Sequence, residues 1–245
     1  MPAAKRQRTA FVRTNDALTG DAASWQGQAL TSVEQITPAG LQLVFDYADA
    51  FKRLVEDGAG ACELLKGKVM AAVFYESSTR TNCSFQAAML RMGGTVIPVD
   101  ASAGGGSAAS KKGETLSDTI KCLECYCDVL VLRHPVKGSS DEAASAASIP
   151  VLNAGDGTGE HPSQALLDLY TIRAELGAGA PAGKTVTLVG DLKNGRTVHS
   201  LAALISRGAF EGAKLCYVSP PELKMPAYIQ QQVAANTAGT LPQVS

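Results

Sequence analysis

The sequence predicts an α/β fold in which two doubly wound parallel-sheet domains are joined by a long helix and the second domain is incomplete. Apolar runs of strand length alternate with segments of helical periodicity along most of the 245 residues, as in parallel sheets with crossover helices. The run that begins at Val69 is apolar at both alternating sets of positions, as in a strand covered on both faces. A stretch rich in Gly, Ala and Pro at 177–183 interrupts this pattern, which then starts again.

The first domain is expected to span residues 27–176. Its first helix, over 37–55, carries Leu41, Phe45 and other apolar residues at helical spacing. The segment 82–92 follows the strand at residue 69, contains no Gly or Pro, and is also predicted to be a helix. The remaining elements continue the alternation: a strand at 95–99, a loose segment at 101–110, a helix from 115, a strand at 128–132, a helix from 141, a strand at 149–153 and a long helix at 162–176.

The second domain is expected to begin at 177 and to run to 245. The predicted elements are a strand at 185–189, a helix at 196–207, a strand at 214–218 and a weaker helix at 226–236. Two strands and two helices cannot close a sheet that is covered on both faces, so we expect this domain to be incomplete. Residues 1–26 are polar and mixed in character, and we expect them to form a mobile extension.

Composition excludes several classes of function. Hydrophobic residues make up 45% of the chain and charged residues 18%, so a substantial core is expected. The 22 Lys and Arg residues nearly balance the 23 Asp and Glu residues, and the net charge of -1 provides no field for nucleic acid or an anionic membrane. No apolar run approaches the roughly 20 residues needed to cross a bilayer. We expect a cytoplasmic protein; the basic residues at 5–8 make plastid or nuclear location a weaker alternative.

The six cysteines are expected to be reduced thiols, because they are not arranged in the disulfide framework of a small secreted domain. Cys122, Cys125 and Cys127 cluster in and just after a predicted helix. A second cysteine pair or a nearby histidine would be needed to complete a zinc site, and the sequence supplies neither. We therefore interpret the three as buried, small apolar side chains and expect no metal.

A group of hydroxyls and one arginine directly follows the strand that begins at Val69. Ser78, Thr79, Arg80 and Thr81 lie at the start of the next helix, where free backbone N–H groups and the helix dipole favour an anion. The guanidinium of Arg80 can bind a phosphate through two hydrogen bonds. The alternative is that a hydroxyl only caps the helix and that Arg80 is solvated.

Four further polar clusters follow other predicted elements. Ligands bind to open parallel sheets beyond the carboxyl ends of the strands, so side chains at these points are candidates for a common site. The clusters are Lys-Lys-Gly-Glu-Thr at 111–115, Arg-His-Pro at 133–135, Asn-Ala-Gly-Asp-Gly with His-Pro-Ser-Gln at 153–164, and Gly-Asp-Leu-Lys-Asn-Gly-Arg-Thr-Val-His-Ser at 190–200. Each has a structural interpretation when it is taken singly. The sequence has no Gly-x-Ser-x-Gly elbow, which would indicate a serine hydrolase. It also lacks the lysine of a phosphate-binding loop, which would indicate a nucleotide site.

In this combination the five clusters resemble the carbamoyltransferase family, in particular its aspartate carbamoyltransferase branch, over residues 28–234. The clusters at 78–81 and 153–164 are shared in kind with ornithine carbamoyltransferases, whereas those at 133–135 and 190–200 favour aspartate as the acceptor. The resemblance implies transfer of the carbamoyl group of carbamoyl phosphate to the amine of L-aspartate, in pyrimidine biosynthesis. It implies no organic cofactor and no metal, and it makes an ornithine enzyme the less favoured alternative.

The resemblance also implies roles for individual residues. Residues 78–81 would bind the phosphate, with Arg80 and Thr81 counted among the catalytic residues. The carbonyl oxygen of carbamoyl phosphate would be reached by Thr81, Arg133 and His161, and its amide by Gln164. His161 precedes a predicted helix, whose dipole disfavours a charged imidazole, so we expect a neutral electrophile.

For the acceptor, the resemblance implies that Arg196 binds the α-carboxylate of aspartate and that Lys112 enters the site from a neighbouring subunit. A homotrimer with shared active sites is therefore expected. His134 and His199 are assigned to structure. At residue 108 an alanine replaces the serine usual in the family, with serines at 107 and 110 as substitutes, and Asn82 stands where bacterial relatives often have arginine.

The family's Arg-x-Gln and His-Pro-Leu-Pro segments do not occur in this sequence. The first would hold the side chain of aspartate, and the second would cover the carbamoyl group. A second hypothesis follows from this difference: a catalytically silent protein that binds carbamoyl phosphate or joins longer chains into an assembly.

Overall fold

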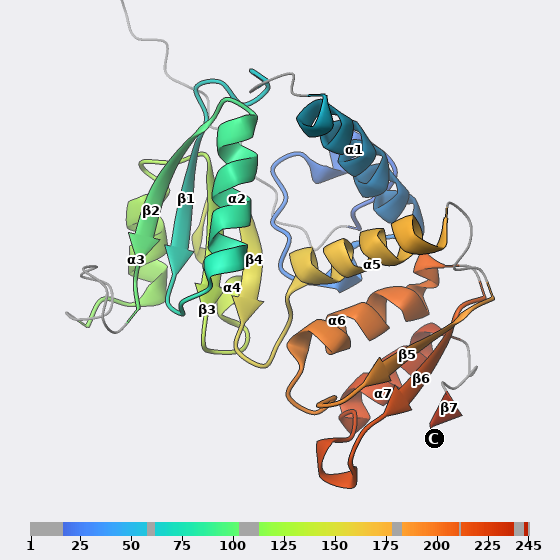
Figure 1. Ribbon diagram of the computed structural model, residues 1–245. Helices are drawn as coiled ribbons and strands as arrows, with labels where there is room; N and C mark the ends of the chain where they lie inside the picture. Colours follow the sequence, from blue (N-terminus) through green and yellow to red (C-terminus); the bar gives the residue numbers. More distant parts are fainter. Residues whose placement is uncertain are drawn as a thin grey trace, which may run out of the picture.

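The computed structural model describes residues 17–57, 62–102, 113–177, 183–210, 212–237 and 243–244. Within these ranges the strands form two parallel sheets, with the orders β2-β1-β3-β4 and β5-β6-β7, and helices pack around both (Figure 1). The predicted α/β class with parallel sheets is confirmed. No helix in the described ranges is long and apolar enough to span a membrane.

The first sheet alternates its strands with helices, as the sequence predicts. Its elements are β1 (Val69–Phe74), α2 (Thr79–Arg91), β2 (Thr95–Asp100), α3 (Leu116–Leu123), β3 (Val129–His134), α4 (Ser139–Ala146) and β4 (Val151–Asp156). Met70 and Phe74 share a core cluster with Met89 of α2, whereas Val73 shares another with Ile120 of α3. Alternate residues of β1 are thus buried on opposite faces, which explains why the whole strand is apolar.

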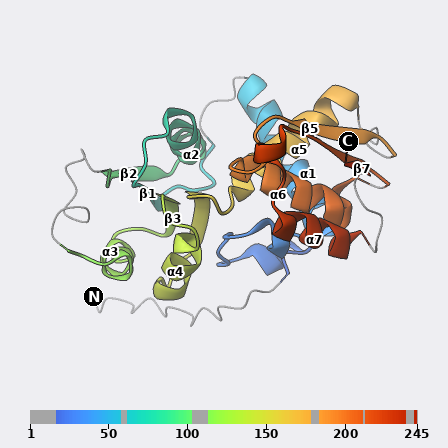
Figure 2. The same cartoon turned by 90° about the horizontal axis from the view of Figure 1, so that it is seen from below.

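A larger core surrounds the second sheet. It includes elements from both ends of the described chain: α1 (Pro38–Glu56), α5 (Pro162–Leu176), β5 (Thr185–Val189), α6 (Arg196–Leu204), β6 (Lys214–Val218) and α7 (Ala227–Asn236). Strand β7 (Gln243–Val244) pairs with β6 in the same sheet. Phe45 of α1, Leu169 of α5, Leu201 of α6, Tyr217 of β6 and Val233 of α7 all belong to one buried cluster. Figure 2 shows α2, α3 and α4 grouped with the first sheet, and α1, α5, α6 and α7 with the second. The domain limits at 176 and 177 stay a prediction.

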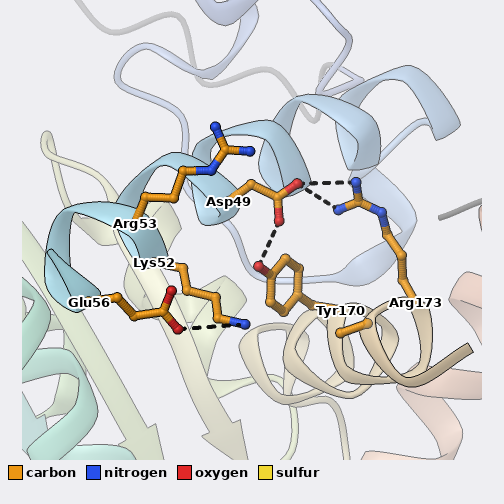
Figure 3. Close-up of a pocket in the computed structure, with 7 residues that line it drawn as sticks. Asp49, Lys52, Arg53, Glu56, Tyr170 and Arg173 are labelled. Atoms are coloured by element: carbon orange, nitrogen blue, oxygen red, sulfur yellow. Dashed lines mark hydrogen bonds and ion pairs between the residues drawn. The ribbon is translucent and has the colours of Figure 1, made fainter. Parts of the chain in front are cut away.

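Helices α1 and α5 are joined by a polar contact at the edge of this core. The Asp49 carboxylate accepts a hydrogen bond of 2.7 Å from the Tyr170 hydroxyl and two of 3.1 Å from the Arg173 guanidinium (Figure 3). The same guanidinium lies 5.2 Å from the centroid of the Phe45 ring. The charges in this cavity of about 320 Å³ therefore largely satisfy one another, and we interpret it as a helix-to-helix contact.

Several elements begin or end at points different from those predicted. Strand β3, for example, runs from Val129 to His134, beyond the predicted end at residue 132. Helix α6 was predicted to reach residue 207 but ends at Leu204. A π-helical turn, Ile205–Ala209, follows it, and Gly208 in this turn has a φ of 87°. Strand β4 begins at Val151 and runs to Asp156, beyond the predicted end at residue 153. The longer β3 and β4 place parts of two predicted loop clusters inside strands.

The segment expected to be a mobile extension is packed from Leu18 onward. The Leu18 side chain is 1% exposed, and its N–H donates to the Gln35 carbonyl at 2.6 Å. The Trp25 indole donates to the Thr19 carbonyl at 2.8 Å. The prediction for residues 1–26 was therefore wrong for this part, because Leu18 and Trp25 find apolar partners that lie far away in the sequence; residues 1–16 lie outside the described ranges.

The interpretation of the cysteine cluster as buried was also wrong for two of its members. Cys122 and Cys125 are exposed, because Thr119 and Ile120 form the buried side of α3. Cys127 is half-buried, and burial raises the pKa of its thiol to about 11. In the described ranges no group of three or more His, Cys, Asp or Glu side chains could hold a metal ion.

Candidate active site

The first part of the site is the beginning of α2, directly after β1. Ser78 has extended backbone angles of φ -153° and ψ 90°, and its side chain makes no capping hydrogen bond. Thr79 and Arg80 are exposed, and Thr81 is half-buried. Because Ser78 does not cap the helix with its hydroxyl, the simple capping interpretation fails, and the first N–H groups of α2 are available to an anion.

The second part brings together two arginines, one from a strand of the first sheet and one from a helix beside the second sheet. Arg133 lies near the end of β3, and Arg196 is the first residue of α6. The Arg133 Nη1 donates to the Ala154 carbonyl at 3.2 Å, and the Arg196 Nη1 donates to the Gly157 carbonyl at 2.6 Å. A methyl group built on Gly155 would lie 3.1 Å from Arg133 Nη1 and 3.2 Å from Arg196 Cζ. Both guanidinium groups therefore lie directly over this glycine.

Glu76 lies between the two arginines and is a site residue that the sequence analysis missed. Its Oε2 is 3.6 Å from Arg133 Nε and 3.8 Å from Arg196 Nη1. Burial and the neighbouring Arg196 lower the pKa of Arg133. One carboxylate between two guanidinium groups leaves the site with excess positive charge, which favours an anionic ligand. The available signal was a carboxylate directly after a buried strand and before the hydroxyl cluster.

His161 is the N-cap residue of α5 and is 4% exposed. Burial, followed by the positive charges of Arg196 and Arg133, lowers its pKa to about 4. Its Nδ1 lies 3.2 Å from the Ser163 hydroxyl. The ring is therefore neutral at physiological pH, as expected for an electrophile, although burial is the main cause rather than the helix dipole invoked from the sequence.

A chain of hydrogen bonds ties His161 to the helix that carries Arg196. The Ser200 hydroxyl accepts a bond of 3.3 Å from the His161 N–H and donates one of 3.4 Å to the Glu160 carboxylate. The same carboxylate accepts a bond of 2.5 Å from the Ser32 hydroxyl. Burial raises the pKa of Glu160. These contacts fix the start of α5 against α6.

The other predicted residues fall into three groups. Gln164 donates through its Nε2 to Asp168 at 2.8 Å, so this amide is directed along its own helix. Lys112 and the serines at 107 and 110 lie outside the described residues. His134 accepts a bond of 3.1 Å from the Val136 N–H, and the Nε2 of His199 lies 2.8 Å from the Leu192 carbonyl. These last contacts agree with the structural roles assigned to the two histidines.

Because the pKa of His161 lies below its ordinary value of 6.5, we expect the free energy of unfolding to fall as the pH decreases from about 6.5 to 4. In that window the unfolded chain binds a proton at this position and the folded chain does not, so acid favours unfolding. The protonation of this residue lowers the free energy of unfolding by about 3 kcal/mol across the window. Denaturant titrations across this window measure it: His161→Gln will flatten the dependence more than the control His134→Gln, and equal curves for both variants would contradict the assignment.

Residues 28–174 match the family described as "Aspartate/ornithine carbamoyltransferase, carbamoyl-P binding domain", which covers more than half of the chain. The chain therefore belongs to the aspartate/ornithine carbamoyltransferase family.

Several relatives are similar to most of this chain. It is 44% identical over 208 residues to the aspartate carbamoyltransferase catalytic subunit of Thermoplasma acidophilum, and the match covers 85% of this chain and 65% of the relative. It is 49% identical over 210 residues to multifunctional protein pyr1-3 of Dictyostelium discoideum, covering 86% of this chain and 9% of that protein. The chain thus spans less than two thirds of the length of either relative.

Solved structures agree with this assignment. Aspartate transcarbamoylase from Trypanosoma cruzi in complex with carbamoyl aspartate and phosphate matches with a TM-score of 0.83 and 42% identity. That match covers 91% of this chain and 71% of the other. The same enzyme in complex with carbamoyl phosphate and aspartate gives a TM-score of 0.83 at 41% identity.

Proposed function

We propose that this chain transfers the carbamoyl group of carbamoyl phosphate to the amine of L-aspartate, giving N-carbamoyl-L-aspartate and phosphate, a step in the synthesis of pyrimidine nucleotides such as UMP. The observation that carries the proposal is the convergence of Arg133 and Arg196 over Gly155, beside a neutral His161. Support also comes from the relatives described above. They include an aspartate carbamoyltransferase catalytic subunit, an aspartate transcarbamoylase and a multifunctional protein.

In the proposed mechanism the start of α2 holds the phosphate. The N–H groups after Ser78, the hydroxyls of Thr79 and Thr81, and the guanidinium of Arg80 neutralise the leaving group. Arg133, His161 and Thr81 polarise the carbonyl oxygen and stabilise the oxyanion that forms when the amine attacks. The tetrahedral intermediate then releases phosphate, which takes a proton from the attacking amine.

The acceptor is held on the other side of the carbonyl. Arg196 binds the α-carboxylate of aspartate, and its distance from Arg133 sets the amine at attacking distance from the carbonyl carbon. Gln164 reaches the carbamoyl amide after its side chain leaves Asp168. Lys112 completes the site from a neighbouring subunit, so the proposed active form is a homotrimer. We propose the cytoplasm as its location.

The test is transfer of an isotope-labelled carbamoyl group by the purified chain, with aspartate and ornithine offered in parallel. Carbamoyl phosphate binding is measured by calorimetry in the same preparation, and the oligomeric state by light scattering. Labelled N-carbamoyl-L-aspartate supports the proposal. Labelled citrulline would replace aspartate with ornithine as the acceptor, and binding without transfer would favour the alternative of a silent carbamoyl-phosphate-binding protein.

A further inference from the structure

Strand β4 contains a bulge opposite Arg133, the arginine proposed to face the carbonyl oxygen of carbamoyl phosphate. In the pairing of β3 with β4, Leu132 faces Asn153 and the next partners are His134 and Asp156. One residue of β3, Arg133, therefore lies opposite two residues of β4. Bulges of this kind leave a backbone group without a strand partner and change the direction of nearby side chains.

Asn153 supplies the hydrogen bonds that this bulge requires. Its side chain is 2% exposed, and its Oδ1 accepts a bond of 2.8 Å from the Gly155 N–H. Its Nδ2 donates a bond of 2.8 Å to the Thr31 carbonyl, in the segment that lies beside the edge of β4. Since a buried polar group without a partner is costly, the side-chain amide stabilises this backbone shape.

The shape matters because Gly155 is the surface on which both site arginines pack. Its φ of 116° is a conformation that L side chains rarely adopt, and a methyl group there would come within 3.3 Å of atoms in both guanidinium groups. The carbonyl of the other bulge residue, Ala154, accepts the hydrogen bond from Arg133. A shift of this short segment would therefore move Arg133 and Arg196 together.

We propose that Asn153 is a positioning residue: its amide holds the bulge of β4 and so fixes Arg133, at the carbamoyl end of the site, relative to Arg196, at the acceptor end. The proposal rests on the function proposed above. Asn153 acts only through the backbone of residues 154 and 155.

The test compares Asn153→Ala with the unaltered chain. Affinity for N-(phosphonacetyl)-L-aspartate, which joins a phosphonate and an aspartate in one molecule, is measured by calorimetry, and kcat and KM for aspartate are measured in the transfer assay. We expect the affinity to fall about 10- to 100-fold, with a fall in kcat as well as a rise in KM, because displacement of positioned groups by about 1 Å has effects of this size. The Tm is recorded for each variant.

Thr37→Ala is the matched control. The Thr37 hydroxyl accepts a bond of 3.0 Å from the Gly40 N–H and donates one of 3.0 Å to the Leu18 carbonyl, so this variant loosens the same N-terminal segment without touching Thr31, Ser32 or Gly155. It is expected to lower the Tm and to leave the affinity unchanged. Asn153→Asp keeps the acceptor for the Gly155 N–H but loses the donor to the Thr31 carbonyl, so it is expected to restore only part of the affinity lost in Asn153→Ala.

Two results would overturn the inference. Unchanged affinity and kcat in Asn153→Ala would show that the bulge does not depend on this amide. An equal loss in Thr37→Ala would show that Asn153 only stabilises the fold. If the unaltered chain fails to bind the probe at all, the proposed function itself fails, and the inference fails with it.

Discussion

Replacement of Arg133 by alanine is expected to lower kcat by about 10²–10³-fold, the usual effect of removing one donor that stabilises a developing oxyanion. Arg133 is suited to this role because its side chain is only 13% exposed and its Nη1 is oriented by the Ala154 carbonyl at 3.2 Å. A steady-state carbamoyl transfer assay measures the effect. The KM for aspartate is expected to change much less, because the residue proposed to bind the acceptor is Arg196.

Arg173→Ala is the matched control for this experiment. Arg173 is also partly buried, with 22% of its side chain exposed, and is also paired with a carboxylate, that of Asp49. Its loss is expected to lower the Tm and to leave kcat unchanged. A fall in kcat of equal size in both variants would show that the effect of Arg133→Ala comes from general destabilisation.

Replacement of Arg80 by alanine is expected to weaken the binding of carbamoyl phosphate by about 10²–10³-fold. The exposed guanidinium lies in the first turn of α2, where it can form two charge-assisted hydrogen bonds with the phosphate, each of about 1.5–3 kcal/mol. Calorimetry with carbamoyl phosphate and with inorganic phosphate measures the loss. Arg80→Lys is expected to recover only part of the affinity, because an ammonium group cannot form the paired geometry.

Arg91→Ala serves as the control within the same helix. Arg91 is exposed in the last turn of α2, at the opposite end from the proposed phosphate site. It is expected to bind carbamoyl phosphate as the unaltered chain does. If Arg80→Lys bound as tightly as the unaltered chain, simple charge attraction would account for Arg80 and the paired geometry would be wrong.

Local patterns in the sequence were sufficient for most elements. Helix α5 spans Pro162–Leu176 as predicted, because proline is favoured in the first turn and a glycine follows the last residue. Strands β5 and β6 also match their predicted bounds, since β-branched and apolar runs there are bounded by turn residues. The hydroxyl and arginine cluster at residues 78–81 was likewise predictable, because its position after a buried strand is itself a local signal.

The sequence by itself therefore determined the α/β class, the order of the elements and the residue types on which the proposed phosphate site rests. Tertiary structure alone decided that Glu76 lies between two arginines, that His161 is buried enough to remain neutral, and that Asn153 supports a bulge beneath Arg133. The physical reason is that periodicity and capping act over a few neighbouring residues. The ion pairs, burial and bulge depend on segments that are far apart in the chain and meet only when the sheets and helices pack.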